Sequence, residues 1–251
     1  MTKIIAVSNH KGGVGKTTTT INLAAALQQK KKRVLLIDMD GQANLTESFG
    51  LSIEEEKTIY GAMKGEYPLP VIKADNGLSI VPSCLDLSAA ESELINEPGR
   101  ELILKGLIAK LLESQKFDYI LIDCPPSLGL LTLNALTAAE YLIIPVQAQF
   151  LAMRGMAKIT NVIATVKERL NPNLHLGGIV ITQFDKRKTL NKGVSEIIND
   201  SFCGKVFKTV IRDNVALAEA PVKGKNIFEY NKNSNGAKDY MSLAQEVLKL
   251  K

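Results

Sequence analysis

Short apolar runs alternate along this chain with longer segments in which apolar residues recur every three or four positions. The runs have the length of strands and lie near residues 3–8, 33–38, 78–81, 118–123, 140–146 and 176–182. Helical spacing is clearest over residues 103–111, over residues 240–248, and from Met156 to Leu170. Because strands that alternate with helices form βαβ units, the pattern predicts an α/β fold: a mostly parallel, twisted sheet with helices on both faces.

No Pro/Ser-rich linker or internal repeat divides the sequence, so we interpret residues 1–251 as a single domain. The most irregular stretch runs from Gly50 to Gly77 and carries an acidic run and two prolines, which predicts a surface excursion. The basic cluster from Lys30 to Arg33 is interpreted as the last turn of a first helix, where cations suit the helix dipole.

The composition, with 45% apolar and 23% charged residues, is typical of a globular protein. The apolar runs are far shorter than the roughly 18 residues of a membrane span, and the N-terminus enters a strand without a signal-peptide pattern. We therefore expect a cytoplasmic protein. Cys84, Cys124 and Cys203 are too widely spaced for a disulfide framework or a metal-binding pair, so we expect reduced packing residues.

Positive charge is concentrated near the C-terminus. The formal net charge is +5. Residues 1–180 carry eighteen basic and eighteen acidic side chains, whereas residues 181–251 carry thirteen basic and eight acidic ones. Such an asymmetry favours a surface that faces a polyanion, although a solvated basic face has the same composition.

A glycine-rich loop follows the first predicted strand and precedes a helical pattern, which is the context that a phosphate-binding loop requires. Backbone N–H groups of such a loop surround phosphate oxygens, Lys16 reaches the β- and γ-phosphates, and Thr17 offers its hydroxyl to Mg²⁺. The residues predicted to hold the nucleotide here are Lys11, Gly12, Gly13, Val14, Gly15, Lys16, Thr17 and Thr18. The general pattern has a further glycine where this chain has His10.

Carboxylates lie at the ends of two predicted strands. Asp38 and Asp40 follow one apolar run, and Asp123 ends another. Parallel α/β sheets bind ligands at the carboxyl ends of their strands, where such side chains hold Mg²⁺ or orient an attacking water. We therefore expect the three aspartates to join the loop in one nucleotide and magnesium site. The sequence contains no Asn-Lys-x-Asp guanine signature, which favours ATP over GTP.

Five motifs follow one another from about Lys3 to Leu248, nearly the whole chain. They are the loop at residues 11–18, LIDMDGQANLT at 36–46, IVPS at 80–83, IDCPPSLGLLT at 122–132, and residues 210–225 with Asn214 and Glu219. Together they resemble the ParA/Soj family of partition ATPases, in the deviant Walker A class that includes MinD. The resemblance implies a Mg²⁺-dependent ATPase that dimerises around two ATP molecules.

The resemblance also implies a role for each site residue. Lys11 would cross the dimer to the partner subunit's ATP, where its ammonium group offsets the repulsion between two triphosphates. Asp40 would orient the hydrolytic water, and Asp123 would lie on the Mg²⁺ side with Asp38 beside it. Asn214 would lie near the adenine.

Members of the family bind DNA without sequence specificity through basic side chains of their C-terminal third. Arg187 matches one such arginine, whereas a second matching position is Asp213, with Arg212 beside it as a candidate substitute. Contacts of this kind to phosphates give salt-dependent affinity. The residues predicted to contact DNA, on a surface contributed mainly by residues 181–251, are Lys186, Arg187, Lys188, Arg212, Lys223 and Lys225.

The resemblance thus implies a nucleoid-associated ATPase whose ATP-bound homodimer binds double-stranded DNA and is released when a ParB-like partner stimulates hydrolysis, so that a chromosome or plasmid is partitioned. A MinD-like ATPase acting at a membrane or protein surface is the alternative. Residues 242–251, however, resemble a core-docking helix rather than a membrane anchor, so no membrane partner is expected. An iron–sulfur carrier would need paired cysteines, and a biosynthetic ligase would depend on a metabolite rather than on DNA.

Overall fold

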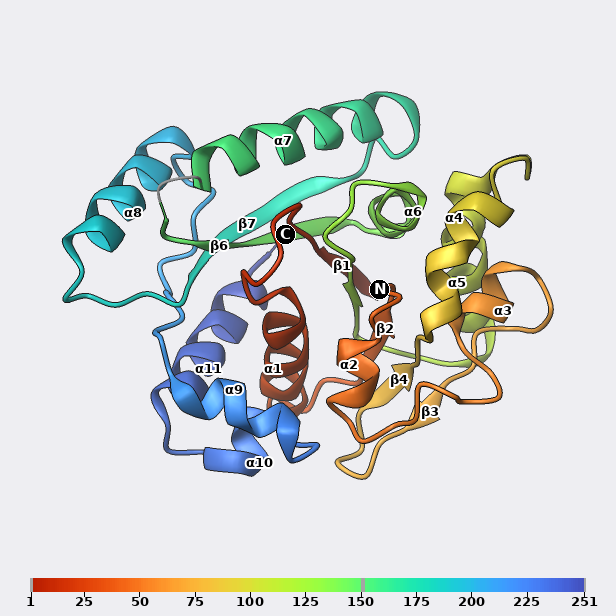
Figure 1. The fold of residues 1–251 in the computed structure, drawn as a ribbon, viewed down its shortest axis with the longest axis horizontal. Helices are drawn as coiled ribbons and strands as arrows, with labels where there is room; N and C mark the ends of the chain where they lie inside the picture. The colour runs from red at the N-terminus through yellow and green to blue at the C-terminus, as the bar shows by residue number, and fades with distance from the viewer. Residues whose placement is uncertain (1, 150–151, 251) are drawn as a thin grey trace.

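The computed structural model describes residues 2–149 and 152–250, without the side chains of residues 152–158, so the predicted core position of Met156 lies outside the described residues. Its strands form one sheet in the order β3-β4-β2-β5-β1-β6-β7 (Figure 1). Only β3 runs antiparallel to its neighbour. The strands are β1 Lys3–Val7, β2 Val34–Asp38, β3 Ile72–Lys73, β4 Ser79–Val81, β5 Tyr119–Asp123, β6 Tyr141–Gln147 and β7 His175–Thr182.

Helices cover both faces of the sheet, as predicted. One face is covered by α1 and α11, and the other by α5, α6 and α7 (Figure 1). The helices are α1 Lys16–Gln29, α2 Asn44–Glu47, α3 Ile59–Met63, α4 Ala90–Glu93, α5 Ile103–Ser114, α6 Leu130–Ala138, α7 Ala152–Arg169, α8 Thr189–Ser201, α9 Val215–Val222, α10 Ile227–Asn231 and α11 Asn235–Val247, with 3-10 turns η1 Leu85–Ala89 and η2 Arg100–Leu102. No helix in the described ranges is long and apolar enough to cross a membrane.

The central strands are apolar throughout because helices bury both of their faces. Every residue of β2 and of β5 is buried. Alternate side chains enter different cores: Leu35 and Ile37 pack on the side of α5 and α6, whereas Val34 and Leu36 pack on the side of α1 and α11.

The strand order brings the polar strand ends together. β5 lies between β1 and β2, with Asp123 level with Val7 on one side and with Asp38 on the other. The loop that follows β1 and the two aspartates therefore share one edge of the sheet, where parallel α/β folds bind ligands.

Three local predictions were wrong. The stretch from Gly50 to Gly77 contains α3 and the edge strand β3, and buries Ile59, Met63 and Leu69 in the core; its short elements have no periodicity long enough to read from sequence. The first helix ends at Gln29, so the cluster from Lys30 to Arg33 follows it. Cys203 is exposed rather than packed.

Candidate active site

The loop after β1 has the geometry of a phosphate-binding loop. Gly13 and Gly15 have positive φ values of 71° and 83°, a left-handed conformation that glycine adopts without steric cost. Helix α1 begins at the next residue, Lys16, so its free backbone N–H groups are directed toward the loop. The loop lines a cleft of about 650 Å³, together with Asp40 and residues of α2 and α9.

Side chains far away in sequence brace this loop. Asn9 donates to the Pro145 carbonyl oxygen at 2.7 Å and accepts from the Lys11 backbone N–H at 3.1 Å. At the end of β7, Thr182 donates to the Val14 carbonyl oxygen at 2.8 Å, and Gln183 donates to that of Gly13 at 2.9 Å. Sequence reasoning missed these bracing residues; the one available signal was that Thr182 ends a predicted strand.

The two lysines of the loop point in different directions. Lys16 is buried, and its Nζ donates to the Lys11 carbonyl oxygen at 3.3 Å. Burial lowers the pKa of Lys16, although the nearby carboxylates of Asp123 and Asp40 oppose that shift. The Nζ of Lys11 instead lies outside the loop and donates to Gln149 Oε1 at 2.6 Å. Only Lys16 is therefore placed to meet a phosphate held by its own loop.

Asp123 and Thr17 form the part of the site that fits Mg²⁺. Thr17 Oγ1 donates to Asp123 Oδ2 at 2.6 Å, and Thr20 Oγ1 donates to Oδ1 at 3.1 Å. Burial, with Asp38 nearby, raises the pKa of Asp123 to about 8, so the site favours a cation beside this carboxylate. No group of three acidic, His or Cys side chains in the described residues could hold a metal alone.

The other two aspartates differ in their surroundings. Asp38 is fully buried; its Oδ1 accepts from the Asp40 N–H, and its Oδ2 accepts from both the N–H and the hydroxyl of Thr46. Burial raises the pKa of Asp38 to about 6. These three donors make Asp38 an anchor of the loop after β2, which argues against the metal role predicted for it. Asp40 is less buried and lines the cleft.

A smaller pocket of about 160 Å³ adjoins the loop at Gly15 and Thr18. Asn214 lines it and caps helix α9, because its side-chain oxygen accepts from the Ala216 N–H at 3.0 Å. Leu217 lines both the pocket and the cleft. The predicted adenine position of Asn214 therefore lies in a pocket that adjoins both the phosphate loop and the cleft.

Known proteins share this arrangement over almost the whole chain. Residues 2–176 match the family model described as an AAA domain. The protein Soj of Bacillus subtilis, a sporulation initiation inhibitor, is 43% identical over 98% of this chain and 98% of its own. The chromosome partitioning protein ParA of Myxococcus xanthus is 43% identical over 98% of this chain and 88% of its own. The crystal structure of a Mycobacterium smegmatis protein named cobyrinic acid a,c-diamide synthase, with bound ADP and magnesium, is 36% identical with a TM-score of 0.87, covering 99% of this chain and 94% of its own.

The chain belongs to the ParA/Soj family. The phosphate loop, the family match and the ADP and magnesium held by the M. smegmatis protein together confirm the predicted ATPase, with ATP and Mg²⁺ as its cofactors. The predicted P-loop fold is confirmed as well. The role of each individual site residue stays a prediction.

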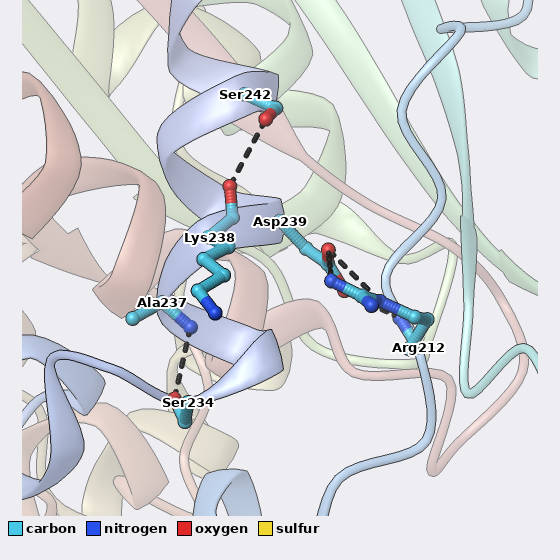
Figure 2. A network of polar contacts seen from close by, with 6 residues as sticks. All are labelled: Arg212, Ser234, Ala237, Lys238, Asp239 and Ser242. Carbon is cyan, nitrogen blue, oxygen red and sulfur yellow. Dashed lines mark hydrogen bonds and ion pairs between the residues drawn. The ribbon is translucent and has the colours of Figure 1, made fainter.

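Two basic residues predicted to contact DNA are held by acids in this ParA/Soj-family chain. Arg187 is highly exposed and pairs with Asp185 at 2.9 Å. Arg212 is pulled onto helix α11, where its Nη2 and Nε donate to the carboxylate of Asp239, the shortest contact being 2.6 Å (Figure 2). Because the Asp239 carboxylate already accepts hydrogen bonds from the Arg212 guanidinium group, the structure favours a packing role for Arg212 over the predicted contact with DNA.

The remaining predicted DNA contacts are exposed lysines. They are Lys186, Lys188, Lys223 and Lys225. None of them has a carboxylate oxygen within 4.0 Å in the described residues. Helix α11 of this ParA/Soj-family chain buries Tyr240, Leu243 and Val247 against the core, which leaves its apolar stripe unavailable for a membrane.

Proposed function

We propose that this ParA/Soj-family ATPase forms a sandwich dimer on binding ATP, and that the dimer binds duplex DNA without sequence specificity while associated with the nucleoid. Hydrolysis, stimulated by a ParB-like partner, would release it, so that nucleotide state is converted into the position of a chromosome or plasmid. The similarity to Soj and ParA along almost the full chain supports the proposal. Residues 1–251 would act as one domain, with residues 181–251 supplying most of the DNA surface.

The observation that carries the proposed dimer is the outward direction of Lys11. Lys16 Nζ donates within its own loop, whereas the Lys11 Nζ donates to Gln149 Oε1 in an exposed hydrogen bond. An exposed ammonium group next to the phosphate loop can contact the triphosphate of a second subunit that faces it. There it would offset the repulsion between two nucleotides, as an arginine finger does.

Hydrolysis would use the remaining residues in separate roles. The backbone N–H groups of residues 12–18 and Lys16 would hold the phosphates, and Asn214 would hold the base. Thr17 and Asp123 would hold Mg²⁺, which supplies electrostatic stabilisation of the charge that develops on the phosphates. Asp40 would orient the attacking water, because it lines the cleft without the burial that immobilises Asp38.

The test is a titration of the purified protein onto a random DNA duplex with MgATP, MgADP or no nucleotide, with the ATP series repeated at several salt concentrations. We expect the tightest binding with ATP, with an affinity that falls steeply as salt rises. If DNA affinity is the same in all three nucleotide states although ATP dimerises the protein, the DNA-partition proposal fails. The MinD-like alternative, a role at a membrane or protein surface, would then be favoured.

A biosynthetic role is the second candidate, because the M. smegmatis structure carries a synthase name. A synthase would couple ATP hydrolysis to a small acid substrate. ATP turnover measured with DNA plus the partner, and separately with a carboxylic acid and an amine donor, distinguishes the two. Stimulation by the small substrates alone would contradict the partition role.

A further inference from the structure

Two consecutive residues at the end of β7 hold two consecutive carbonyl groups of the phosphate loop. Thr182 Oγ1 donates to the Val14 carbonyl oxygen at 2.8 Å, and Gln183 Nε2 donates to the Gly13 carbonyl oxygen at 2.9 Å. Strand β6 lies between β1, which leads into the loop, and β7. These contacts therefore join the loop to a strand that is not its neighbour in the sheet.

The geometry of the peptide group gives these contacts a second effect. The carbonyl of one residue and the N–H of the next belong to one planar trans group and point in opposite directions. When the carbonyls of Gly13 and Val14 are held by β7, the N–H groups of Val14 and Gly15 are therefore directed to the opposite side of the loop. Neither N–H has an acceptor among the described residues, so both are available to a phosphate.

The backbone of Gln183 explains how two neighbouring side chains reach the same loop. In a regular strand, consecutive side chains point to opposite faces of the sheet. The Ile211 N–H donates to the Ile181 carbonyl oxygen at 2.8 Å, and the Ile211 carbonyl oxygen accepts from the Phe184 N–H at 3.0 Å. Thr182 and Gln183 thus lie together opposite Ile211, which is a β-bulge, and Gln183 has a left-handed φ of 50°. Bulges and left-handed residues redirect side chains next to functional sites.

The surroundings of the two side chains fix the direction in which each donates. The side-chain oxygen of Gln183 accepts from the side-chain amide of Gln147 at the end of β6, which leaves its nitrogen for the Gly13 carbonyl. The Thr182 side chain is buried, with 2% of the residue exposed, so water cannot replace its hydroxyl on the Val14 carbonyl. The loop carbonyls are therefore held by donors that are themselves held.

We propose that Thr182 and Gln183 are positioning residues for nucleotide binding, which aim the N–H groups of Val14 and Gly15 at the phosphates of ATP. The phosphates meet these N–H groups both before and during hydrolysis, so the loss of either side chain should raise KM for MgATP more than it lowers kcat. The inference requires only the ATPase activity and does not depend on the proposed role in DNA partition.

The first experiment measures MgATP hydrolysis without DNA, together with unfolding midpoints. Thr182→Val keeps the shape of the side chain and removes the donor, so we expect KM to rise by about tenfold while kcat falls by less than about twofold. Thr182→Ser retains the hydroxyl and should recover most of the affinity. Thr137→Val, the same change at a buried threonine of α6, is the matched control and should have the KM of the wild type.

The second experiment uses the left-handed conformation of Gln183. Gln183→Gly removes the side-chain amide but suits a positive φ, so the unfolding midpoint should stay level or rise while KM rises by about fivefold. Lys31 also has a positive φ, of 60°, and lies after α1, away from the loop. Lys31→Gly is therefore the matched control, with the same effect on the midpoint and no effect on KM.

Three results would overturn the proposal. The first is a wild-type KM in both Thr182→Val and Gln183→Gly, and the second is a Thr182→Ser variant that binds as weakly as Thr182→Val. The third is a KM that follows the unfolding midpoint across all five variants, because the two residues would then only support the fold. None of these results affects the DNA titration that tests the proposed function.

Discussion

Three aspartates lie at one edge of the sheet: Asp38, Asp40 and Asp123. Their surroundings differ, and so do the roles that each side chain can have. Asp38 is enclosed and accepts hydrogen bonds from three donors of its own loop. Asp123 is equally buried but contacts the hydroxyl groups of the phosphate loop and of α1. Asp40 lines the cleft, and its Oδ1 accepts from the Gln42 N–H. Their positions in the sequence place these carboxylates in one site, whereas their burial and hydrogen-bond partners distinguish their roles.

The first prediction contrasts Asp38→Ala with Asp40→Ala. Asp38→Ala leaves three buried donors without an acceptor, so we expect a loss of about 2–4 kcal/mol in the free energy of unfolding. Asp40→Ala should keep its stability and its MgATP affinity, while ATP turnover falls by about 100-fold or more. Chemical denaturation and steady-state ATPase assays measure these effects. Unchanged turnover in Asp40→Ala would show that another group positions the water.

The second prediction concerns the pH dependence of stability. The pKa of Asp123 is about 8 in the folded protein, against an ordinary value of 3.8, so between these values the folded state retains a proton that the unfolded state has lost. Stability of the nucleotide-free protein should therefore fall as pH rises from 4 through 8. Asp38, with a pKa of about 6, contributes with the same sign only at the lower end of this range.

Asp123→Asn tests the assignment, because the amide cannot ionise. Thermal unfolding midpoints between pH 6 and 8.5 should decline in the wild type and stay level in the variant. The variant should also lose the stabilisation that MgATP gives beyond ATP alone. A wild-type midpoint that does not change between pH 6 and 8 would contradict the assigned burial cost.

Among the elements, helix α11 does more than cover the sheet. Its Asp239 holds Arg212 by both side-chain and backbone hydrogen bonds, which fixes the segment between β7 and α9 (Figure 2). Asn214, two residues further on, caps α9 beside the small pocket. The position of the predicted adenine contact thus depends on a helix that begins more than twenty residues later.

The third prediction separates Arg212 from Arg187. Arg212→Ala should cost about 1 kcal/mol of stability, a figure reduced because the pair is partly exposed, and should weaken ATP affinity more than DNA affinity. Arg187→Glu should weaken ATP-dependent DNA binding by about tenfold while leaving stability and dimerisation unchanged. Duplex titration and nucleotide binding assays on both variants provide the comparison. A DNA isotherm unaltered by Arg187→Glu would place the DNA surface elsewhere.

For the whole molecule, the proposed cycle couples two ligands through one dimer. If ATP raises the affinity for DNA by some factor, DNA must raise the affinity for ATP by the same factor. The fourth prediction is that saturating duplex DNA tightens ATP binding to the wild type by the ratio of the DNA dissociation constants measured without and with ATP. Lys16→Ala should abolish both effects. ATP binding that duplex DNA leaves unchanged would show that DNA does not favour the ATP-bound dimer.

Much of this molecule follows from local sequence. The phosphate loop is a contiguous motif whose glycines, lysine and threonines act within eight residues. The buried strands are also readable, since their apolar runs need no knowledge of their partners. Family membership, the α/β fold and the ATPase activity were therefore within reach of the sequence, as was the placing of Asp123 beside the loop, because parallel strand ends meet at one edge.

What the sequence alone determined is thus the buried strands, the longer helices and the chemistry of contiguous motifs. Only the tertiary structure decided which distant side chains complete them: Thr182 and Gln183 under the loop, and Asp239 on Arg212. The physical reason is that helical and strand periodicity record burial along one element, whereas contacts between elements depend on strand order. In this sheet, the crossover from β1 to β2 passes over β5. The spacing of apolar residues within each element does not indicate that strand order.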